Sequence, residues 1–214
     1  MGKIGDSFFF IGQGLFLTLG LLVGGLCIGL TLGTLLSLAR RMNRASWWVD
    51  RWVSVLRGTP LILQLSFIYF AVPGMMGIKI NVFAAGIFTF GCNSSAYIAE
   101  ILKSGIEALP KGQFEAAKSL EIPFYFMWKD IILPQVFRQV LPSLMNETIS
   151  LLKETALIGT IGGMDIMRMA QILGAEQFTY FLPLCLAGVY YYGLVFLFEK
   201  IGEKIEKKVS YATH

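Results

Sequence analysis

The sequence ALPKGQFEAAKSLEIPFYFMWKDIILP, Ala108–Pro134, is the longest stretch in the middle of the chain that does not resemble a membrane span. Apolar runs lie on both sides of it. Loops in compact proteins usually have about 4–6 residues, and longer ones are often functional. A polar segment of this length between two spans has to lie in water on one side of the membrane, so it predicts a functional loop.

The first half of this loop has the pattern of a short helix. Pro110 can open the helix, because the first helical position needs no N–H. Pro123 can stop it, because the residue before a proline is pushed out of helical geometry. Glu115 early and Lys118 late match the helix dipole. One face is apolar: Phe114, Ala117, Leu120 and Phe124. The segment is either an amphipathic linker on the membrane surface or a docking helix for a partner that stays outside the membrane.

The composition indicates an integral membrane protein. Of 214 residues, 55% are hydrophobic and 15% charged, and the mean hydropathy is +0.64, whereas soluble domains have about 25% charged residues. The three cysteines lie in apolar runs, which predicts buried apolar side chains and no disulfide framework. With one histidine, His214, the sequence predicts no metal site and no cofactor. The net charge of +4 fits a loop bias in a membrane protein, not nucleic-acid binding.

The apolar runs predict an all-α, polytopic membrane protein with five transmembrane helices in a single domain, residues 1–214. A bilayer needs about 20 apolar residues per helix. Gly25, Gly29 and Gly33 recur every four residues in the first run, which lets another helix approach closely. The spans are expected at residues 8–39, 56–78, 80–104, 135–162 and 177–200, with the long loop at residues 105–134.

The basic residues predict the orientation of these spans, because cytoplasmic loops carry an excess of Lys and Arg. One side of the membrane receives five arginines after the first span: Arg40, Arg41, Arg44, Arg51 and Arg57. The same side receives five more cations in the long loop and four in the tail: Lys103, Lys111, Lys118, Lys129, Arg138, Lys200, Lys204, Lys207 and Lys208. The other side receives three: Lys3, Lys79 and Arg168. We therefore expect the N-terminus outside, and the C-terminus and the long loop inside.

Polar residues interrupt the third and fourth spans. A charge at bilayer depth costs about 2.5–3.5 kcal/mol on insertion scales, so it persists where it faces a cavity or a partner. Helical spacing puts three polar residues of the fourth span on one face: Glu147, Ser150 and Glu154. It does the same in the third span, with Ser94 beside them: Asn93, Tyr97 and Glu100. The two faces predict a hydrated path with a solute site; the alternative is hydrogen bonding that only holds the helices together.

Enzyme motifs are absent from the sequence. It contains no GxxxxGK[ST] loop to hold ATP phosphates and no HExxH. No serine or cysteine nucleophile stands near a histidine in a span. The chain is therefore not expected to be an enzyme, and any ATP hydrolysis would come from a separate subunit.

Most of the chain resembles a known protein family. From about residue 10 to about residue 200 it is similar to the membrane-spanning permease subunit of bacterial ABC-type importers, in the branch for polar amino acids, with a type I importer fold. The resemblance rests on four stretches: RGTPLILQLSFIYF (Arg57–Phe70), NSSAYIAEILKSGIEALPKGQFEAAKSL (Asn93–Leu120), IILPQVFRQVLP (Ile131–Pro142) and LLKETALIGTIG (Leu151–Gly162).

One part of the resemblance is a cytoplasmic signature, the EAA loop. Glu115-Ala116-Ala117, followed by Leu133-Pro134, is similar to it. Glu121 stands where the family usually has glycine, which puts the local turn in doubt, although Pro123 can end the helix instead.

The resemblance implies partners, location and site residues. It implies a bacterial cytoplasmic (inner) membrane protein that pairs with a second permease chain, a copy or a close paralogue. It also implies two cytoplasmic ATP-binding subunits and an extracytoplasmic solute-binding protein. The residues expected to couple to the ATPase are Gln113, Glu115, Ala116, Ala117 and Leu120. The residues expected to bind the amino acid are Asn93, Ser94, Tyr97, Glu154 and Thr155.

Glu154 could hold the ammonium group of an amino acid, while hydroxyl and amide groups hold its carboxylate. The identity of the amino acid and of the second permease chain stays open. Two other classes also stay open: an ion-coupled secondary transporter or channel that acts without an ATPase, and a structural or signalling membrane subunit.

Overall fold

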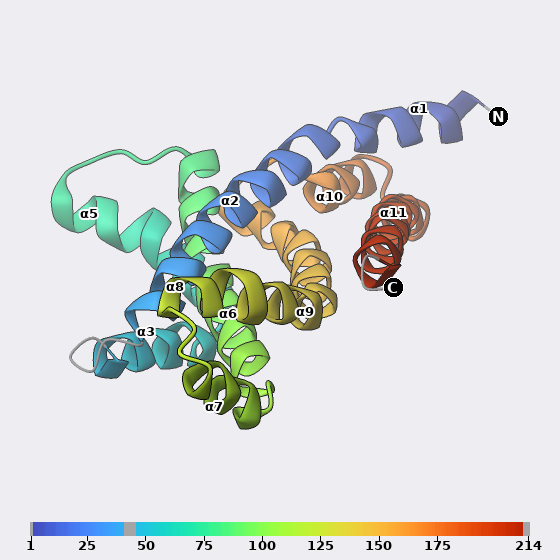
Figure 1. The fold of residues 1–214 in the computed structure, drawn as a ribbon. Helices are drawn as coiled ribbons and strands as arrows, with labels where there is room; N and C mark the ends of the chain where they lie inside the picture. The colour runs from blue at the N-terminus through green and yellow to red at the C-terminus, as the bar shows by residue number, and fades with distance from the viewer. Residues whose placement is uncertain (1, 41–45, 212–214) are drawn as a thin grey trace.

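The computed structural model describes residues 2–40 and 46–211, and every regular element in them is helical (Figure 1). Arg41, Arg44 and His214 lie outside the described residues. In chain order the elements are α1 (Gly2–Gly12), α2 (Leu15–Ala39), α3 (Ser46–Gly58), α4 (Leu61–Ser66), η1 (Phe67–Ala71), α5 (Val72–Met76), α6 (Val82–Glu107), α7 (Lys111–Ser119), α8 (Phe124–Phe126), η2 (Met127–Ile132), α9 (Leu133–Glu154), η3 (Thr155–Ile161), α10 (Ile166–Glu176) and α11 (Phe181–Tyr211).

Three apolar segments are long enough to cross a membrane: Ile4–Ala39, Val82–Glu107 and Phe181–Lys208. A fourth is possible if α3 and the helix Leu61–Met76, which are bent by 101° relative to each other, count as one broken span. The break falls at Pro60, whose extended backbone, with ψ of 133°, separates the two helices. α9 has 22 residues, but charged side chains along it keep it out of this apolar set.

Helices α2 and α6 cross closely through the glycine stripe of α2. Gly25, Gly29 and Gly33 are all buried in this contact. A Cβ atom built on Gly29 would lie 2.9 Å from Cβ of Ser94, and one on Gly33 would lie 2.8 Å from Cβ of Ile98. The close approach predicted from the four-residue spacing is therefore confirmed, and α6 is the helix that approaches.

We expect Gly33→Ala to destabilise the chain by about 1–3 kcal/mol, the usual cost of overpacking a tight contact. Its new methyl group would meet the backbone oxygen of Ser95 at 2.9 Å, which cannot rotate away. Gly25→Ala is the matched control, because its Cβ would have no neighbour nearer than 3.4 Å. Thermal unfolding in detergent measures both, and an equal loss in the two variants would contradict the assigned contact.

The helix expected around Glu115 is α7, and it ends in a left-handed turn at Glu121, whose φ is +53°. The amide of Ile122 donates to the carbonyl of Ala117 at 3.0 Å, which closes the turn. Glycine is usual at such a position, because it has no Cβ to strain. Glu121 thus makes the same turn that a glycine would make, and Pro123 begins the next helical segment, α8.

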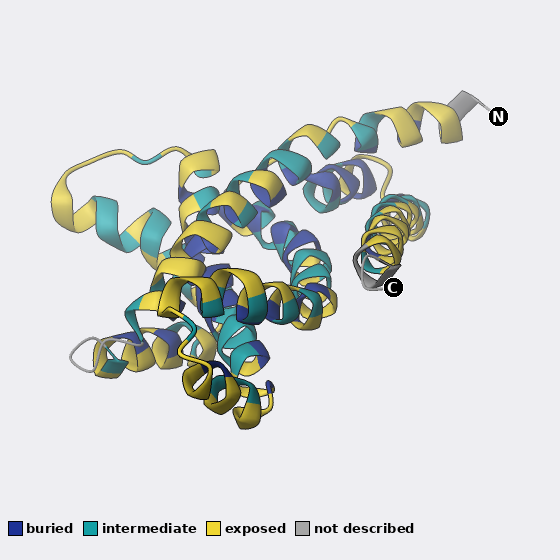
Figure 2. Cartoon of the chain, viewed as in Figure 1, coloured by how far each residue is buried: buried dark blue, intermediate teal, exposed yellow. Residues whose placement is uncertain are grey.

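Helix α10 was not expected as a separate element. Asp165 caps its N-terminus by accepting hydrogen bonds from the amides of Met167 at 3.1 Å and Arg168 at 3.0 Å. The hydroxyl of Tyr191 donates to the same carboxylate at 3.0 Å, which ties α10 to α11. Buried residues concentrate along α10 and the α2–α6 contact, whereas α7, α8 and much of α11 are exposed (Figure 2).

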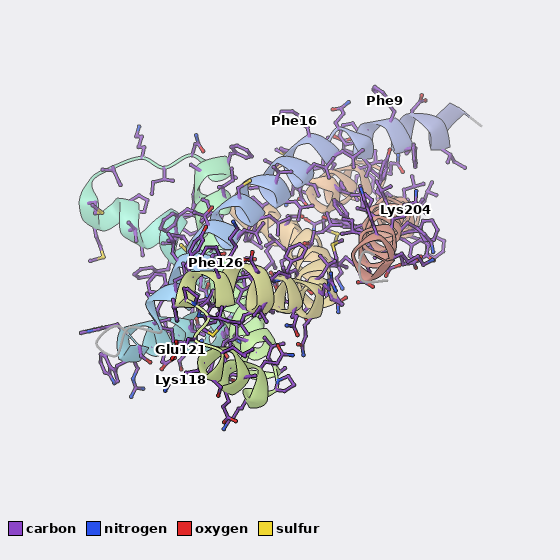
Figure 3. All side chains as sticks on the ribbon, in the orientation of Figure 1. Phe9, Phe16, Lys118, Glu121, Phe126 and Lys204 are labelled. Atoms are coloured by element: carbon purple, nitrogen blue, oxygen red, sulfur yellow. The ribbon has the colours of Figure 1, made fainter. Side chains whose placement is uncertain are left out.

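The exposed side chains differ between the two ends of the molecule. Phe9 and Phe16 project from α1 and α2 and are 75% and 89% exposed. Lys118 and Glu121, which follow the EAA segment, lie at the other end in the same view (Figure 3). Aromatic side chains this exposed on an apolar helix are expected to contact lipid, since the described residues leave most of their surface uncovered.

Candidate functional site

A polar cavity of 340 Å³ lies between α6 and α9. α6 contributes one aromatic and one aliphatic side chain, and α9 contributes a row of polar ones at helical spacing. The lining residues are Tyr97, Ile101, Ser143, Asn146, Glu147, Ser150 and Glu154. The polar face expected on the fourth span, Glu147 with Ser150 and Glu154, therefore lines a single cavity.

The two carboxylates of the cavity differ in their surroundings. Ser94 on α6 donates a hydrogen bond from Oγ to Oε1 of Glu147 at 2.7 Å. This bond joins α6 to α9 and fixes the orientation of one carboxylate. The carboxylate of Glu154 has no hydrogen bond or ion pair within residues 2–40 and 46–211, which leaves its oxygens available to a solute.

The residues expected to bind substrate separate into two groups. Tyr97 and Glu154 line the cavity. Asn93, Ser94 and Thr155 are not among the lining residues and are buried, with exposed fractions of 3%, 0% and 0%. The hydroxyl of Thr155, the first residue of η3, donates to the carbonyl of Leu152 in the last turn of α9 at 2.6 Å. Roles of these three in substrate binding stay predictions.

Several lining residues were missing from the expected substrate set although the sequence pattern contained them. Asn146, Glu147 and Ser150 belong to the polar series of the fourth span, and Ser143 lies one turn before Glu147. Their helical spacing from Glu154 was the signal that could have identified them.

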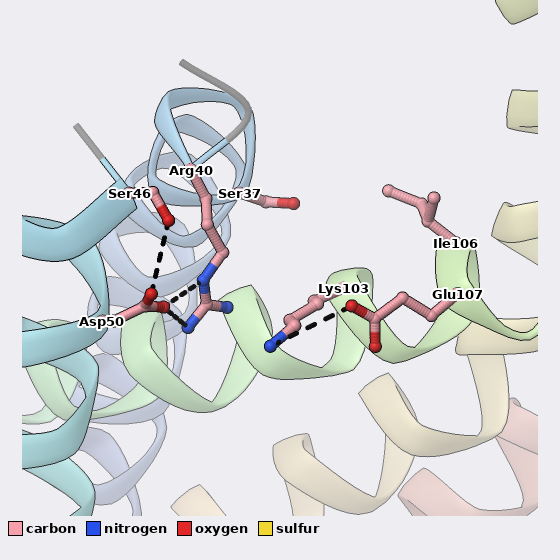
Figure 4. Close-up of a pocket in the computed structure, with 7 residues that line it drawn as sticks. All are labelled: Ser37, Arg40, Ser46, Asp50, Lys103, Ile106 and Glu107. Atoms are coloured by element: carbon pink, nitrogen blue, oxygen red, sulfur yellow. Dashed lines mark hydrogen bonds and ion pairs between the residues drawn. The ribbon is translucent and has the colours of Figure 1, made fainter. Parts of the chain in front are cut away.

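Glu100 was expected on the same polar face as Tyr97, but it belongs to an ion-pair network. One of its oxygens lies 2.6 Å from Nη2 of Arg40 and the other 3.7 Å from Nη1 of Arg57. Arg40 also contacts Asp50, whose other oxygen accepts from Ser46 (Figure 4). The network joins the end of α2 to α3 and α6, so Glu100 stays in a charged cluster and not in the cavity.

The same network reaches the cavity through Arg57. Its guanidinium carbon lies 5.2 Å from the ring centroid of Tyr97, a cation–π distance. Tyr97 thus has the guanidinium against its ring while it also lines the cavity. The arrangement places Tyr97 in a fixed position relative to α3.

Helix α7 presents two different faces. Glu115, Ala116 and Leu120 are exposed. Ala117 is 3% exposed and Gln113 is half-buried, so these two residues face the chain's own helices. Of the five residues expected to couple to an ATPase, three have surface that a partner could contact, and two anchor the helix.

The cavity is suited to binding a cationic group. Two carboxylates and the hydroxyl and amide groups beside them can accept hydrogen bonds from an ammonium or guanidinium group. No Lys or Arg side chain is among its lining residues. Within the described residues, no group of three His, Cys, Asp or Glu side chains is placed to hold a metal ion.

Comparison with known proteins gives close relatives along nearly the whole chain. A putative glutamine transport system permease protein of Rickettsia bellii is 46% identical over 209 residues, which cover 97% of this chain and 96% of the relative. The arginine transport system permease protein of Bacillus subtilis is 43% identical over 203 residues, which cover 94% and 93%.

Solved structures have the same fold. An amino acid ABC transporter crystallised with histidines matches with a TM-score of 0.88 and 34% identity, covering 97% of this chain and 96% of that one. The inward-facing MetNI methionine ABC transporter matches with a TM-score of 0.76 at 20% identity, covering 94% and 96%, which supports the fold alone. The expected fold, an all-helical permease of the ABC importer type, is therefore confirmed.

The family model described as the binding-protein-dependent transport system inner membrane component matches residues 25–211. This match covers most of the chain, and the relatives and the solved structures cover more than nine-tenths of it. The chain therefore belongs to the family of inner-membrane components of binding-protein-dependent transport systems.

Proposed function

We propose that this chain is the permease subunit of an ATP-driven importer for polar amino acids. The observation that carries the proposal is the cavity between α6 and α9, where Glu147 and Glu154 face the same space. A carboxylate pair without a lining cation favours a solute that carries an ammonium group, which every amino acid has. The relatives named for glutamine and arginine transport support the same substrate class.

Within this proposal, the solute contacts Glu154 and Tyr97 directly. Glu147, oriented by Ser94 at 2.7 Å, supplies a second negative charge. Asn146 and Ser150 are exposed on the same wall and can bind the carboxylate of the amino acid. Asn93 and Thr155, which are buried and do not line the cavity, would support the helices that form it.

We also propose five membrane spans with the N-terminus outside and the C-terminus inside. The three apolar helices, the broken pair around Pro60 and α9 make up the five. α9 can cross the membrane despite its charges because Glu147 and Glu154 face the cavity and not lipid. The excess of Lys and Arg after the first span, in the long loop and in the tail supports this orientation.

The complete transporter would contain four kinds of partner: a second permease chain, two cytoplasmic ATP-binding subunits, an extracytoplasmic solute-binding protein and the amino acid. α7 would contact an ATP-binding subunit through Glu115, Ala116 and Leu120. Closure of the ATPase pair would move the spans and switch the cavity between the two sides of the membrane.

Uptake by reconstituted vesicles tests this function. We expect vesicles that contain the permease, its ATP-binding subunits and the solute-binding protein to accumulate labelled glutamine or arginine only when ATP is inside them. Vesicles without the ATP-binding subunits are the control. Membership of a binding-protein-dependent family favours the ATP-driven importer over an ion-coupled secondary transporter. Uptake driven by an ion gradient without ATP would reverse that preference.

A further inference from the structure

We infer that Gln113 and Gln135 form the joint through which α7 moves α9, an inference that rests on the proposed function. In this role the two glutamines are positioning residues, because they bond to each other and do not line the cavity. Gln113 lies on α7, and Gln135 lies in the first turn of α9. The inference identifies the contact that connects the ATPase side of the chain to the cavity.

The two side chains form a reciprocal amide pair. Nε2 of Gln113 donates to Oε1 of Gln135 at 2.9 Å, and Nε2 of Gln135 donates to Oε1 of Gln113 at 2.8 Å. Nε2 of Gln135 also donates to the carbonyl of Ile131 at 2.8 Å, which holds this amide against its own helix. Both residues are half-buried. Two antiparallel hydrogen bonds fix the relative orientation of two helices more tightly than an apolar contact, which can slide.

Apolar packing beside the pair is consistent with a joint. Phe114, the next residue on α7, packs against a buried cluster that contains Leu109, Ile132 and Val136. Its ring centroid lies 6.2 Å from that of Trp128 in η2. The amide pair joins α7 to Gln135, and Phe114 packs against a cluster that contains Val136, so two neighbouring residues of α7 contact the start of α9.

Helix α9 then carries the contact to the cavity. It is continuous from Leu133 to Glu154. Gln135 and Glu147 are separated by twelve residues, which corresponds to about 18 Å at the 1.5 Å rise of an α-helix. A displacement of α7 that also displaces Gln135 would therefore move the carboxylate of Glu147. It would also move that of Glu154, which lies two turns further along α9. The face of α7 toward the ATPase and the face toward α9 are different, so docking and transmission are separable.

The test uses the complete transporter in vesicles and measures the number of amino acids transported per ATP hydrolysed. We expect Gln113→Leu and Gln135→Leu each to assemble with the ATP-binding subunits and to lower this ratio at least about fivefold, because each removes both bonds of the pair and the net contribution of one bond already corresponds to about that factor. The double variant is expected to fall no further, because both single variants remove the same pair. Gln139→Leu, at an exposed position one turn later on α9, is the matched control and should keep the wild-type ratio.

A rescue experiment distinguishes transmission from a folding defect. Gln113→Glu combined with Gln135→Lys replaces the amide pair by an ion pair and should restore most of the ratio. A wild-type ratio in both leucine variants, or losses that multiply in the double variant, would overturn the joint. If a single variant does not assemble, recovery of assembly and ratio in the Glu–Lys pair supports the joint, and failure of both contradicts it. A wild-type transporter that moves no amino acid would instead refute the proposed function.

Discussion

Ala117→Asp is expected to abolish ATP-dependent uptake, with at least a hundredfold loss. Ala117 is 3% exposed, on the face of α7 that lies against the rest of the chain. An unpaired carboxylate there would lose its hydration, and the effective penalty for a buried ion is several kcal/mol. Helix α7 would separate from the part of the chain it packs against. The exposed residues Glu115 and Ala116 would then no longer be held where an ATPase can contact them.

The neighbouring residue provides the control for this prediction. Ala116 is exposed, so Ala116→Asp should leave the thermal stability of the isolated permease unchanged. Ala117→Asp should lower that stability. Co-purification with the ATP-binding subunits and uptake in vesicles complete the comparison. Full uptake by the Ala117→Asp variant would show that the buried face of α7 has no part in coupling.

The elements that could be predicted from sequence depend on local patterns. The glycines of α2 recur at a spacing that favours a close helix crossing over glycines merely tolerated in a span, and Gly33 does lie against Ile98 of α6. The helix α7 follows Pro110 and has Lys118 in its last turn, so it could be placed between Pro110 and Leu120, although Glu115 does not lie in its first turn as expected. The polar face of α9 likewise follows from helical period alone, because Glu147 and Glu154 are two turns apart.

The positions that could not be predicted depend on contacts between distant segments. Asn93 and Ser94 belong to a helix with polar residues, but the approach of α2 and α9 covers them completely or nearly so. Glu100 has helical spacing from Tyr97, yet Arg40 and Arg57 on other segments draw its carboxylate into ion pairs. No periodicity within α6 carries information about those partners.

Breaks between helices are a second feature that the apolar runs of the sequence did not predict. The span over residues 56–78 stays a prediction, and the structure adds a bend of 101° between α3 and the helix Leu61–Met76, at Pro60. Proline after Gly58-Thr59 was the local signal, since a residue before proline avoids helical geometry. Helix α10 was not predicted although Asp165, a residue type that often caps a helix N-terminus, was a local signal for its start; the bond from Tyr191 on α11 to Asp165 appears only in the fold.

Glu154→Gln is expected to weaken uptake of arginine about 10- to 100-fold in apparent affinity, the range that corresponds to a hydrogen bond to a charged group. The substitution keeps the shape of the side chain and removes its charge. Glu154 lines the cavity without a bond from the described residues, whereas Glu147 already accepts from Ser94. Glu154 is therefore the carboxylate that a cationic group can bind without displacing a partner.

A concentration series of labelled arginine and glutamine in reconstituted vesicles measures this effect. Glu107→Gln is the matched control, because it also removes one carboxylate but lies 65% exposed at the end of α6. If Glu154 binds the ammonium group that all amino acids share, arginine and glutamine should lose affinity equally. If it binds the side chain, arginine should lose more. Unchanged affinity for both would assign Glu154 to the structure of α9 and leave the cavity without its proposed ligand contact.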